Sequence, residues 1–191
     1  MSGRALTARE AALQALYRVE RDGAFLNLAL PPLLGGLPPR ERALARELAS
    51  GTVRRRNTLD WSLELFLKRP LGELTIWMRN LLRLSAYQLL YLERIPAHAA
   101  VDEAVKLARR YGHRGVAGLA NAVLRRLAAA GGDLPWPDPA RRPVEELVLR
   151  YSHPPWLVER WVRRFGLEEA RSLCEANNIP PPLALRPNRL R

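Results

Sequence analysis

The chain has very few of the residues that disulfides and metal sites require. Its 191 residues include one cysteine, Cys174, and three histidines. A single cysteine cannot form an internal disulfide, which favours a reducing, cytoplasmic compartment. The histidines lie far apart without metal-ligand spacing, so His98, His113 and His153 are predicted to stabilise turns and helix ends. The composition therefore excludes a zinc site of the usual kind.

Long apolar runs and catalytic motifs are missing as well. No apolar run reaches the roughly 18 residues that a membrane-spanning helix needs, and the first residues lack the apolar core of a signal peptide. There is no glycine-rich phosphate loop after a strand, no Gly-x-Ser-x-Gly and no carboxylate pair on an apolar helix face. Cys174 precedes the acidic Glu175, so an inert, half-buried thiol is predicted. We expect no membrane partner and no active site in this chain.

Arginine, in contrast, is abundant. There are 31 basic and 19 acidic residues, a net charge of +12, and only two of the basic residues are lysines. Residues 1–130 hold 21 basic and 11 acidic residues, whereas residues 131–191 hold 10 and 8. A GC-rich genome would explain arginine in place of lysine, but it would not explain the excess over acids. A basic first part is the electrostatic footprint expected for nucleic acid; the alternative is a merely soluble basic surface.

Helical periodicity dominates the first part of the chain. Thr7 and Glu10 form a capping-box pattern at the start of the first helix. Apolar residues at i, i+3 and i+4 predict further helices, and the clearest segments are 7–20, 40–54, 75–92 and 115–130. Segment 75–92 is apolar almost all round, which places it in the middle of a bundle. Because the loops are short, we predict an all-α bundle of six or seven helices over residues 1–130.

The composition changes after residue 130. Residues 131–143 include four prolines and two glycines, which is typical of a semi-rigid linker. Residues 144–191 predict three short helices followed by a strand-like tail at 183–186, although Pro187 removes a backbone donor there. A lone strand has no ladder partner. We therefore expect residues 144–191 to be the beginning of a module that is incomplete in this chain.

Three consecutive arginines are the first candidates for phosphate binding. Arg54, Arg55 and Arg56 lie between two predicted helices. Guanidinium groups there can bind phosphate oxygens bidentately and can stack on splayed bases. The alternative is a solvated end that complements the dipole at a helix C-terminus. The sequence leaves both interpretations open.

Two further arginine pairs are candidates of the same kind. Arg125 and Arg126 carry the same ambiguity as the triplet. Arg4 and Arg9 lie near the start of the first helix, where the helix dipole disfavours cations. Arginines at a position where they do not stabilise the helix indicate a ligand-binding role. Both pairs are therefore included, with the triplet, in the predicted RNA-binding set.

The tryptophans are predicted to be structural. Trp61, Trp77, Trp156 and Trp161 fall on apolar stripes, which indicates core positions. A base-stacking platform needs exposed aromatic rings beside basic residues. The pattern predicts no such platform.

Several sequence blocks, found in order along the whole chain, resemble the RsmB (Sun) family. They are Arg40-x-Arg42-Ala43-Leu44-Ala45, Gly51-Thr52-Val53-Arg54-Arg55-Arg56, Leu59-Asp60-Trp61, Leu81-Leu82-Arg83-Leu84, Tyr87-Gln88-Leu89-Leu90, Pro96-x-His98-Ala99-Ala100-Val101-Asp102-Glu103-Ala104-Val105, Asn121-Ala122-Val123-Leu124-Arg125-Arg126 and Tyr151-Ser152-His153-Pro154 with Trp156-Leu157-Val158-Glu159. The first seven resemble the family's NusB-like N-terminal domain. The last resembles the start of the module that precedes its methyltransferase domain.

This resemblance implies a function as well as a fold. Enzymes of the family use S-adenosylmethionine to methylate carbon 5 of a cytosine in small-subunit ribosomal RNA. It implies an RNA-binding role for the bundle, with the catalytic domain outside this chain. The family's catalytic Pro-Cys pair has no counterpart here, so no catalytic residue and no cofactor site is carried over to this chain.

Two other functions are consistent with the residues. A stand-alone NusB-like adaptor would act in transcription antitermination through both RNA and a protein partner, and would have no use for residues 143–191. A purely structural interaction module would tolerate reversal of the charges at Arg54, Arg55 and Arg56.

Overall fold

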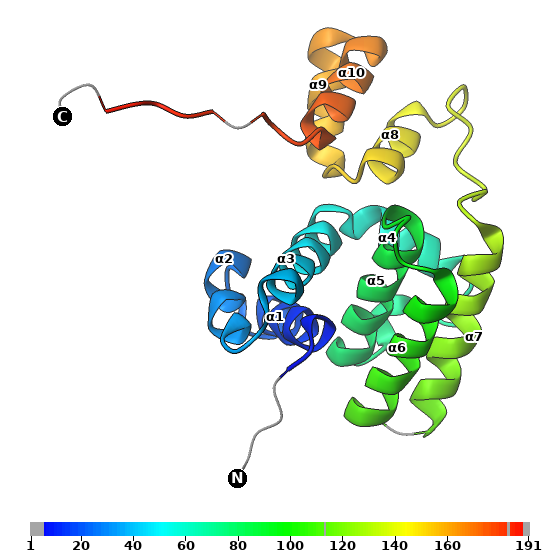
Figure 1. The fold of residues 1–191 in the computed structure, drawn as a ribbon. Coiled ribbons are helices and arrows are strands. Elements are labelled where there is room, and N and C mark those ends of the chain that lie inside the picture. The colour runs from blue at the N-terminus through cyan, green and yellow to red at the C-terminus, as the bar shows by residue number, and fades with distance from the viewer. Residues whose placement is uncertain (1–5, 113, 183, 189–191) are drawn as a thin grey trace. The chain divides into compact units, whose positions relative to one another are not determined.

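The computed structural model describes residues 6–112, 114–182 and 184–188. It divides the chain into two compact units, 1–135 and 136–191. Every regular element in the described residues is an α-helix or a short 3-10 turn (Figure 1). The predicted all-α fold is therefore confirmed.

The first unit is a bundle of α-helices joined by short connections. In its described residues the helices are α1 (Ala8–Asp22), α2 (Leu26–Ala29), α3 (Pro39–Arg54), α4 (Arg56–Glu64), α5 (Ile76–Tyr91), α6 (Ala97–Tyr111) and α7 (Arg114–Ala130). Two 3-10 turns, η1 (Pro31–Leu34) and η2 (Leu71–Glu73), link α2 to α3 and α4 to α5. This agrees with the predicted bundle of six or seven helices.

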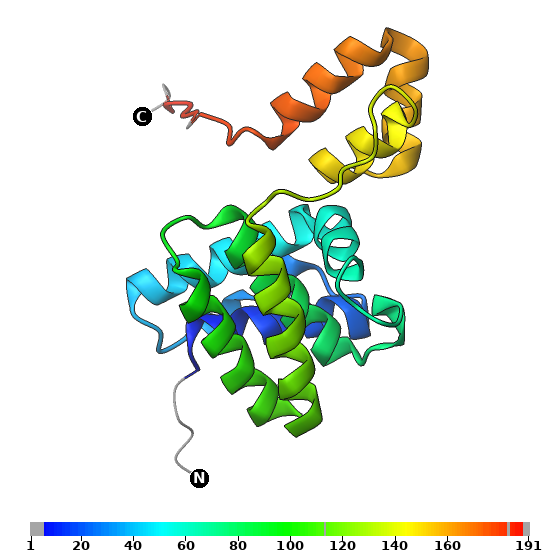
Figure 2. The same ribbon diagram turned by 90° about the vertical axis from the view of Figure 1, so that its right-hand side faces the viewer.

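Helix α5 is the centre of this bundle. It packs against α1, α3, α4, α6 and α7, and Leu82, Leu84 and Ala86 are completely buried. Helices α6 and α7 run side by side along the bundle (Figures 1 and 2). A helix with neighbours on several sides must be apolar on several sides, which explains the sequence pattern of this segment.

The predicted capping box is present at the start of α1. The Thr7 hydroxyl accepts a hydrogen bond from the Glu10 backbone at 3.2 Å, and the Glu10 carboxylate accepts one from the Thr7 backbone at 2.8 Å. Gly23 ends the helix with φ +65°, a conformation that favours glycine. Both ends of α1 are therefore determined locally.

The second unit contains three helices in its described residues. These are α8 (Pro143–Tyr151), α9 (Pro155–Phe165) and α10 (Leu167–Asn178). They pack around a small apolar cluster formed by Leu147, Val148, Val158, Ala170 and Cys174. Each helix contributes to the cluster, so the second unit has a core of its own.

Two predictions for the second unit are wrong or not confirmed. The prediction that Trp156 is a core residue is wrong: its side chain is 63% exposed, because it lies in the first turn of α9 on the face opposite Val158. The predicted strand-like tail at 183–186 is not observed at 184–186, where the backbone forms no ladder, and Leu183 lies outside the described residues. No helix in the described part of the chain is long and apolar enough to span a bilayer.

Candidate nucleic-acid interface

The arginine triplet lies at the junction of two helices. Helix α3 ends at Arg54 and α4 begins at Arg56, while Arg55 between them has φ −99° and ψ 15°. Arg54 and Arg56 are exposed, and Arg55 is half-buried. The guanidinium of Arg55 lies over the Tyr91 ring, 4.9 Å from its centroid. The junction therefore presents two arginines to solvent on either side of one that is held against the bundle.

Tyr91 positions Arg55 from the last turn of α5. Burial raises the pKa of the Tyr91 phenol, and the nearby positive charge of Arg55 and a hydrogen bond with Thr58 oppose that rise. The ring therefore stays neutral and offers its face to the guanidinium, a geometry that favours a cation. Stacking of this kind limits the conformations of Arg55 before any ligand arrives.

A close approach of α3 to α5 supports the same junction one turn earlier. Gly51 leaves room for the ring of Tyr87, whose hydroxyl donates a hydrogen bond to Glu47 at 2.6 Å. Burial, followed by the Glu47 carboxylate, raises the pKa of Tyr87 strongly, although Arg54 and Arg55 lower it. Glu47 and Tyr87 thereby fix the direction in which α3 runs towards the arginine triplet.

A buried ion-pair network, which the sequence reasoning missed, ties α4 to α1 and α5. Arg83 is 5% exposed, and its guanidinium meets Asp60 through two contacts, Nε–Oδ1 at 2.5 Å and Nη2–Oδ2 at 2.9 Å. Its third nitrogen, Nη1, donates to Glu20 at 2.8 Å. Arg79 also pairs with Glu20, at 2.6 Å. Three helices are therefore joined by charges around one arginine.

In this network, attraction between the paired groups offsets the effect of burial on their pKa values. Burial alone would lower the pKa of Arg83, but hydrogen bonding and attraction from Asp60 and Glu20 raise it. Burial alone would raise the pKa of Glu20, but the positive charge of Arg83 and hydrogen bonds from Asn80 and Arg79 lower it. Both shifts favour the charged forms of Arg83 and Glu20. Arg56 reaches the edge of this network, 3.8 Å from Asp60.

Arg125 and Arg126 lie on the exposed side of α7. The Nε of Arg125 donates to the side chain of Asn121 at 3.0 Å. Arg126 lies over the Phe66 ring at 5.3 Å and its Nη1 donates to the Phe66 carbonyl at 3.4 Å. Phe66 follows the C-terminal end of α4, whereas Arg56 begins that helix. The triplet and Arg126 therefore lie at opposite ends of α4, roughly 15 Å apart along its axis.

The structure describes only one residue of the other predicted pair, Arg4 and Arg9. Arg9 is half-buried, and its Nε donates to Gln88 of α5 at 2.8 Å. It contacts α5 one turn from Tyr91, the residue under Arg55. Arg4 lies outside the described residues. The structure therefore groups Arg54, Arg55, Arg56 and Arg126 around α4, with Arg9 near the end of α5.

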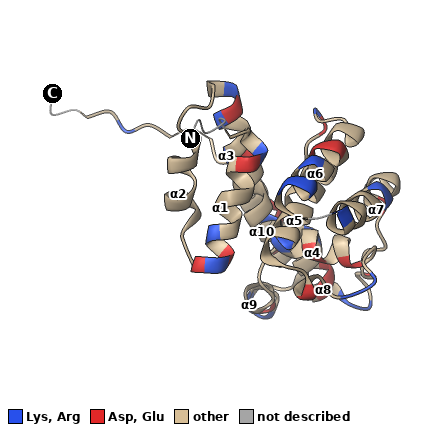
Figure 3. Ribbon diagram, turned by 90° about the horizontal axis from the view of Figure 1, so that it is seen from below, with Lys and Arg blue, Asp and Glu red and all other residues tan. Residues whose placement is uncertain are grey.

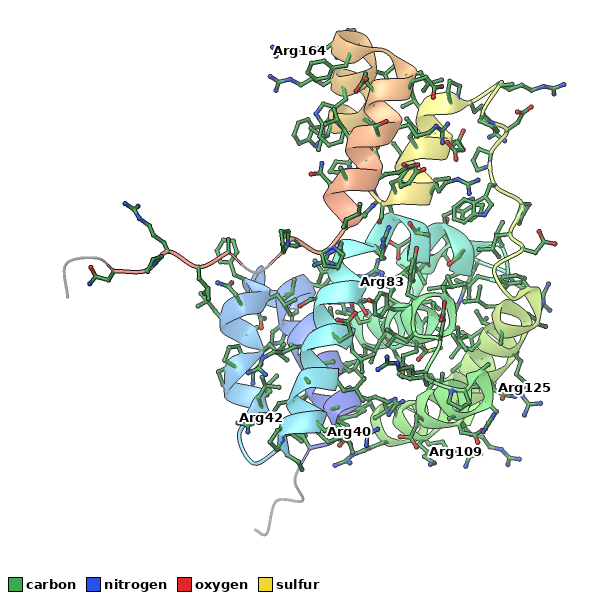
Figure 4. The ribbon with its side chains drawn as sticks, turned by 45° about the horizontal axis from the view of Figure 1, so that its top comes forward. Arg40, Arg42, Arg83, Arg109, Arg125 and Arg164 are labelled. Carbon is green, nitrogen blue, oxygen red and sulfur yellow. The ribbon has the colours of Figure 1, made fainter. Side chains whose placement is uncertain are left out.

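Basic residues are not confined to one stripe of the first unit. Figure 3 shows blue positions on α3, α6 and α7 with red positions between them. In Figure 4, Arg125 and Arg109 point outward from the bundle, whereas Arg83 lies among the helices. Arg110, from the pair 109–110, pairs with the buried Glu10, which makes it structural. Exposed guanidinium groups such as Arg54 and Arg125 are suited to phosphate oxygens.

One feature of the sequence could have indicated the ion-pair network around Arg83. Arg83 interrupts the run Leu81-Leu82-Arg83-Leu84 in the most apolar helix. A charged residue in a helix with packed neighbours on most sides must find a buried partner. The identity of that partner, Asp60 from another helix, depends on tertiary packing.

In the described residues there is also no group of histidine, cysteine or carboxylate side chains that could hold a metal ion.

Comparison with known families agrees with this arrangement. The NusB family model matches residues 6–129. A second model, described as the RsmF/B-like methyltransferase ferredoxin-like domain, matches residues 153–191. The two matches follow one another along the chain.

Curated relatives are similar over almost the whole chain. A protein of Bacillus subtilis named probable ribosomal RNA small subunit methyltransferase B is 39% identical over 185 residues, which is 96% of this chain and 41% of the relative. A ribosomal RNA small subunit methyltransferase B of Pseudomonas putida is 38% identical over 181 residues, 95% of this chain and 40% of the relative. The chain thus spans about 40% of the length of these relatives.

A solved structure shows the same fold for the first unit. The structure of T. maritima NusB is 30% identical and covers 64% of this chain and 88% of its own, with a TM-score of 0.60. Together with the match of the family model over residues 6–129, this similarity identifies the helical bundle. The chain belongs to the NusB family.

Proposed function

We propose that this chain is the RNA-binding region of a methyltransferase that acts on small-subunit ribosomal RNA. The succession of a NusB match and an RsmF/B-like methyltransferase match in one chain carries the proposal. The curated relatives that share both parts are named as such methyltransferases. The resemblance in sequence implies carbon 5 of a cytosine as the methyl acceptor. The division into an RNA-binding domain (1–130), a linker (131–143) and the start of a following module (144–191) is part of the proposal.

The arginines around α4 would hold the RNA. Arg54 and Arg56 are exposed at one end of α4 and Arg126 at the other, so phosphates of one folded RNA can be contacted at both ends. Arg55, which is pre-positioned on Tyr91, would orient the RNA backbone between them. Neutralisation of phosphates releases counterions, which makes such binding depend strongly on salt. Arg125 and Arg9 would extend the same basic surface.

S-adenosylmethionine would supply the methyl group in the complete enzyme. Sites for such cofactors in open α/β folds lie where strands turn into helices. The described residues include no strand, so they do not fit the cofactor, and we assign no residue of this chain to it. The role of this chain is to bind and position the substrate RNA in the cytoplasm.

Charge reversal at the triplet tests this function. The variant Arg54→Glu/Arg56→Glu should weaken binding to a small-subunit ribosomal RNA fragment at low salt, and should reduce the slope of log K against log salt by roughly one per lost phosphate contact. Arg55 is left in place because it packs on Tyr91. Fluorescence anisotropy with a labelled RNA measures both quantities.

The same helix offers a matched control. Arg40 and Arg42 are exposed near the start of α3, at the opposite end from the triplet (Figure 4). Arg40→Glu/Arg42→Glu changes the net charge equally, and should leave the affinity largely unchanged. Equal loss in both variants would show that only net charge matters. Absence of binding by the unaltered chain at low salt would overturn the proposed function.

A further inference from the structure

Helix α9 of the second unit carries an exposed tryptophan beside exposed arginines. Trp156 is 63% exposed in the first turn of α9. Arg160 and Arg163 follow it on the same helix, and both are exposed. With 3.6 residues per turn, these three positions fall within an arc of about 60°. An exposed indole and two guanidinium groups therefore share one face.

This face is exposed in the described chain because the opposite face of α9 forms the core of the unit. Val158 is completely buried, and Trp161 and Val162 pack against the same cluster of Leu147 and Cys174. The exposure of Trp156 is thus a consequence of helix periodicity. An exposed aromatic ring beside basic residues is what a base-stacking site requires.

The arginines on this face are available to a ligand. Among the described residues, neither Arg160 nor Arg163 forms an ion pair, in contrast to Arg150 and Arg171, which both pair with the buried Glu146. Arg164 extends the basic surface, with its guanidinium 5.3 Å from the Phe165 ring (Figure 4). The helix carries one acidic residue, Glu159, on the edge of the face.

Among the helices of the unit, α9 is the basic one. Helix α9 holds three arginines and one glutamate, whereas α10 holds three glutamates and one arginine. The net charge of the second part of the chain is small, so the basic character of α9 is a local feature. A local cationic face around an exposed ring is the arrangement that binds single-stranded nucleic acid by stacking and phosphate contact.

We propose that Trp156, with Arg160 and Arg163, is a second RNA site of this chain that binds an unpaired nucleotide and its flanking phosphates. The indole stacks on one base, and Arg160 and Arg163, roughly 6 and 10 Å further along the helix axis, contact the phosphates. The site rests on the proposed function, because it assumes that the partner of the chain is RNA. It would hold a single-stranded segment while the α4 surface of the first unit holds folded RNA.

Binding of a short single-stranded RNA by the full chain tests the site. The probe is a labelled oligonucleotide of about ten nucleotides, long enough for a single stacking site, and a fully paired RNA duplex is measured in parallel. Trp156→Ala should weaken binding of the single strand by roughly ten-fold or more and change duplex binding little. Trp156→Phe, which keeps a stacking ring, should retain most of the affinity. Ile179→Ala, at a side chain 67% exposed in the same unit, is the matched control and should have no effect.

The outcomes separate this site from the proposed function. If Trp156→Ala binds the single strand as the unaltered chain does, or if the phenylalanine variant is as weak as the alanine variant, the stacking site is wrong. In either case, weaker duplex binding by Arg54→Glu/Arg56→Glu still supports the proposed function. Should Trp156→Ala fail to fold, quenching of tryptophan emission by the single strand decides the matter. Quenching that is lost in the folded Trp156→Phe variant supports the site, and absence of quenching in the unaltered chain overturns it.

Discussion

The ring of Tyr87 occupies the space that a side chain on Gly51 would need. A β-carbon on residue 51 would lie 2.0 Å from Cζ of Tyr87 and 2.2 Å from its hydroxyl oxygen. No real contact is that short, so the α3–α5 packing requires glycine at this position. The same contact places the Tyr87 hydroxyl on Glu47 and sets the direction of α3 towards Arg54. A helix contact thus positions the candidate RNA surface.

Replacing Gly51 should destabilise the bundle. In a helix, Gly→Ala is ordinarily stabilising by about 0.5–1 kcal/mol, but Gly51→Ala forces the Tyr87 ring aside and should cost roughly 1–3 kcal/mol. At Gly118 of α7 a β-carbon would have no neighbouring atom within 4 Å, so Gly118→Ala should have the opposite sign. Denaturant unfolding measures both, and equal effects at the two glycines would contradict the steric explanation.

Removing Arg83 should destabilise the protein far more than removing a surface arginine. Arg83→Leu removes the two hydrogen bonds to Asp60 and one of the two arginine partners of Glu20, and should cost roughly 2–4 kcal/mol, because breaking a largely buried ion pair leaves its partners poorly compensated. Arg83→Lys should also destabilise, since an ammonium cannot reproduce the two parallel contacts to Asp60. Arg125→Leu is the control and should stay within about 0.5 kcal/mol. Thermal unfolding of the three variants checks the order.

The same network should make stability depend on pH in the acid range. The pKa of Glu20 is lowered from 4.5 by Arg83, Asn80 and Arg79, against the opposing effect of burial. A carboxylate with a lowered pKa contributes stability above its unfolded pKa, and this contribution is lost as pH falls through the folded value. The difference in unfolding free energy between the unaltered chain and Glu20→Gln should therefore shrink between about pH 5 and pH 3.

Cys174 should be unreactive in the folded protein. It is completely buried in the second unit, and burial raises the pKa of its thiol to about 11. Relative to the ordinary value of 9.0, the thiolate is roughly 100-fold less populated. A thiol reagent at neutral pH should react slowly with the native chain and quickly after denaturation. Rapid stoichiometric reaction without denaturant would show that the α8–α10 cluster opens readily.

Local chemistry explains what could be predicted from the sequence. The capping box of Thr7 and Glu10 depends on residues three positions apart, and the apolar circumference of α5 depends on its own period. Helix positions and the central place of α5 follow from such patterns. None of these needs a partner from a distant part of the chain.

The features that the sequence did not predict depend on distant partners. Trp156 shares the apolar character of Trp161, but only the packing of α9 on Leu147 and Cys174 decides which tryptophan faces inward. In the same way, periodicity cannot choose Asp60 as the partner of Arg83, because the two residues come from separate helices. Sequence periodicity identifies the residues that share a helix face, whereas tertiary packing decides whether that face is buried or exposed.

The sequence alone determined an all-helical, arginine-rich chain, because helix periodicity, capping and net charge are properties of nearby residues and of composition. Tertiary structure alone decided which charges are buried and which remain available. Arg83 and Arg110 are used in internal ion pairs, whereas Arg54, Arg56 and Arg160 remain exposed. The physical reason is that desolvation and pairing depend on what packs against a side chain, and that is known only once the helices are assembled.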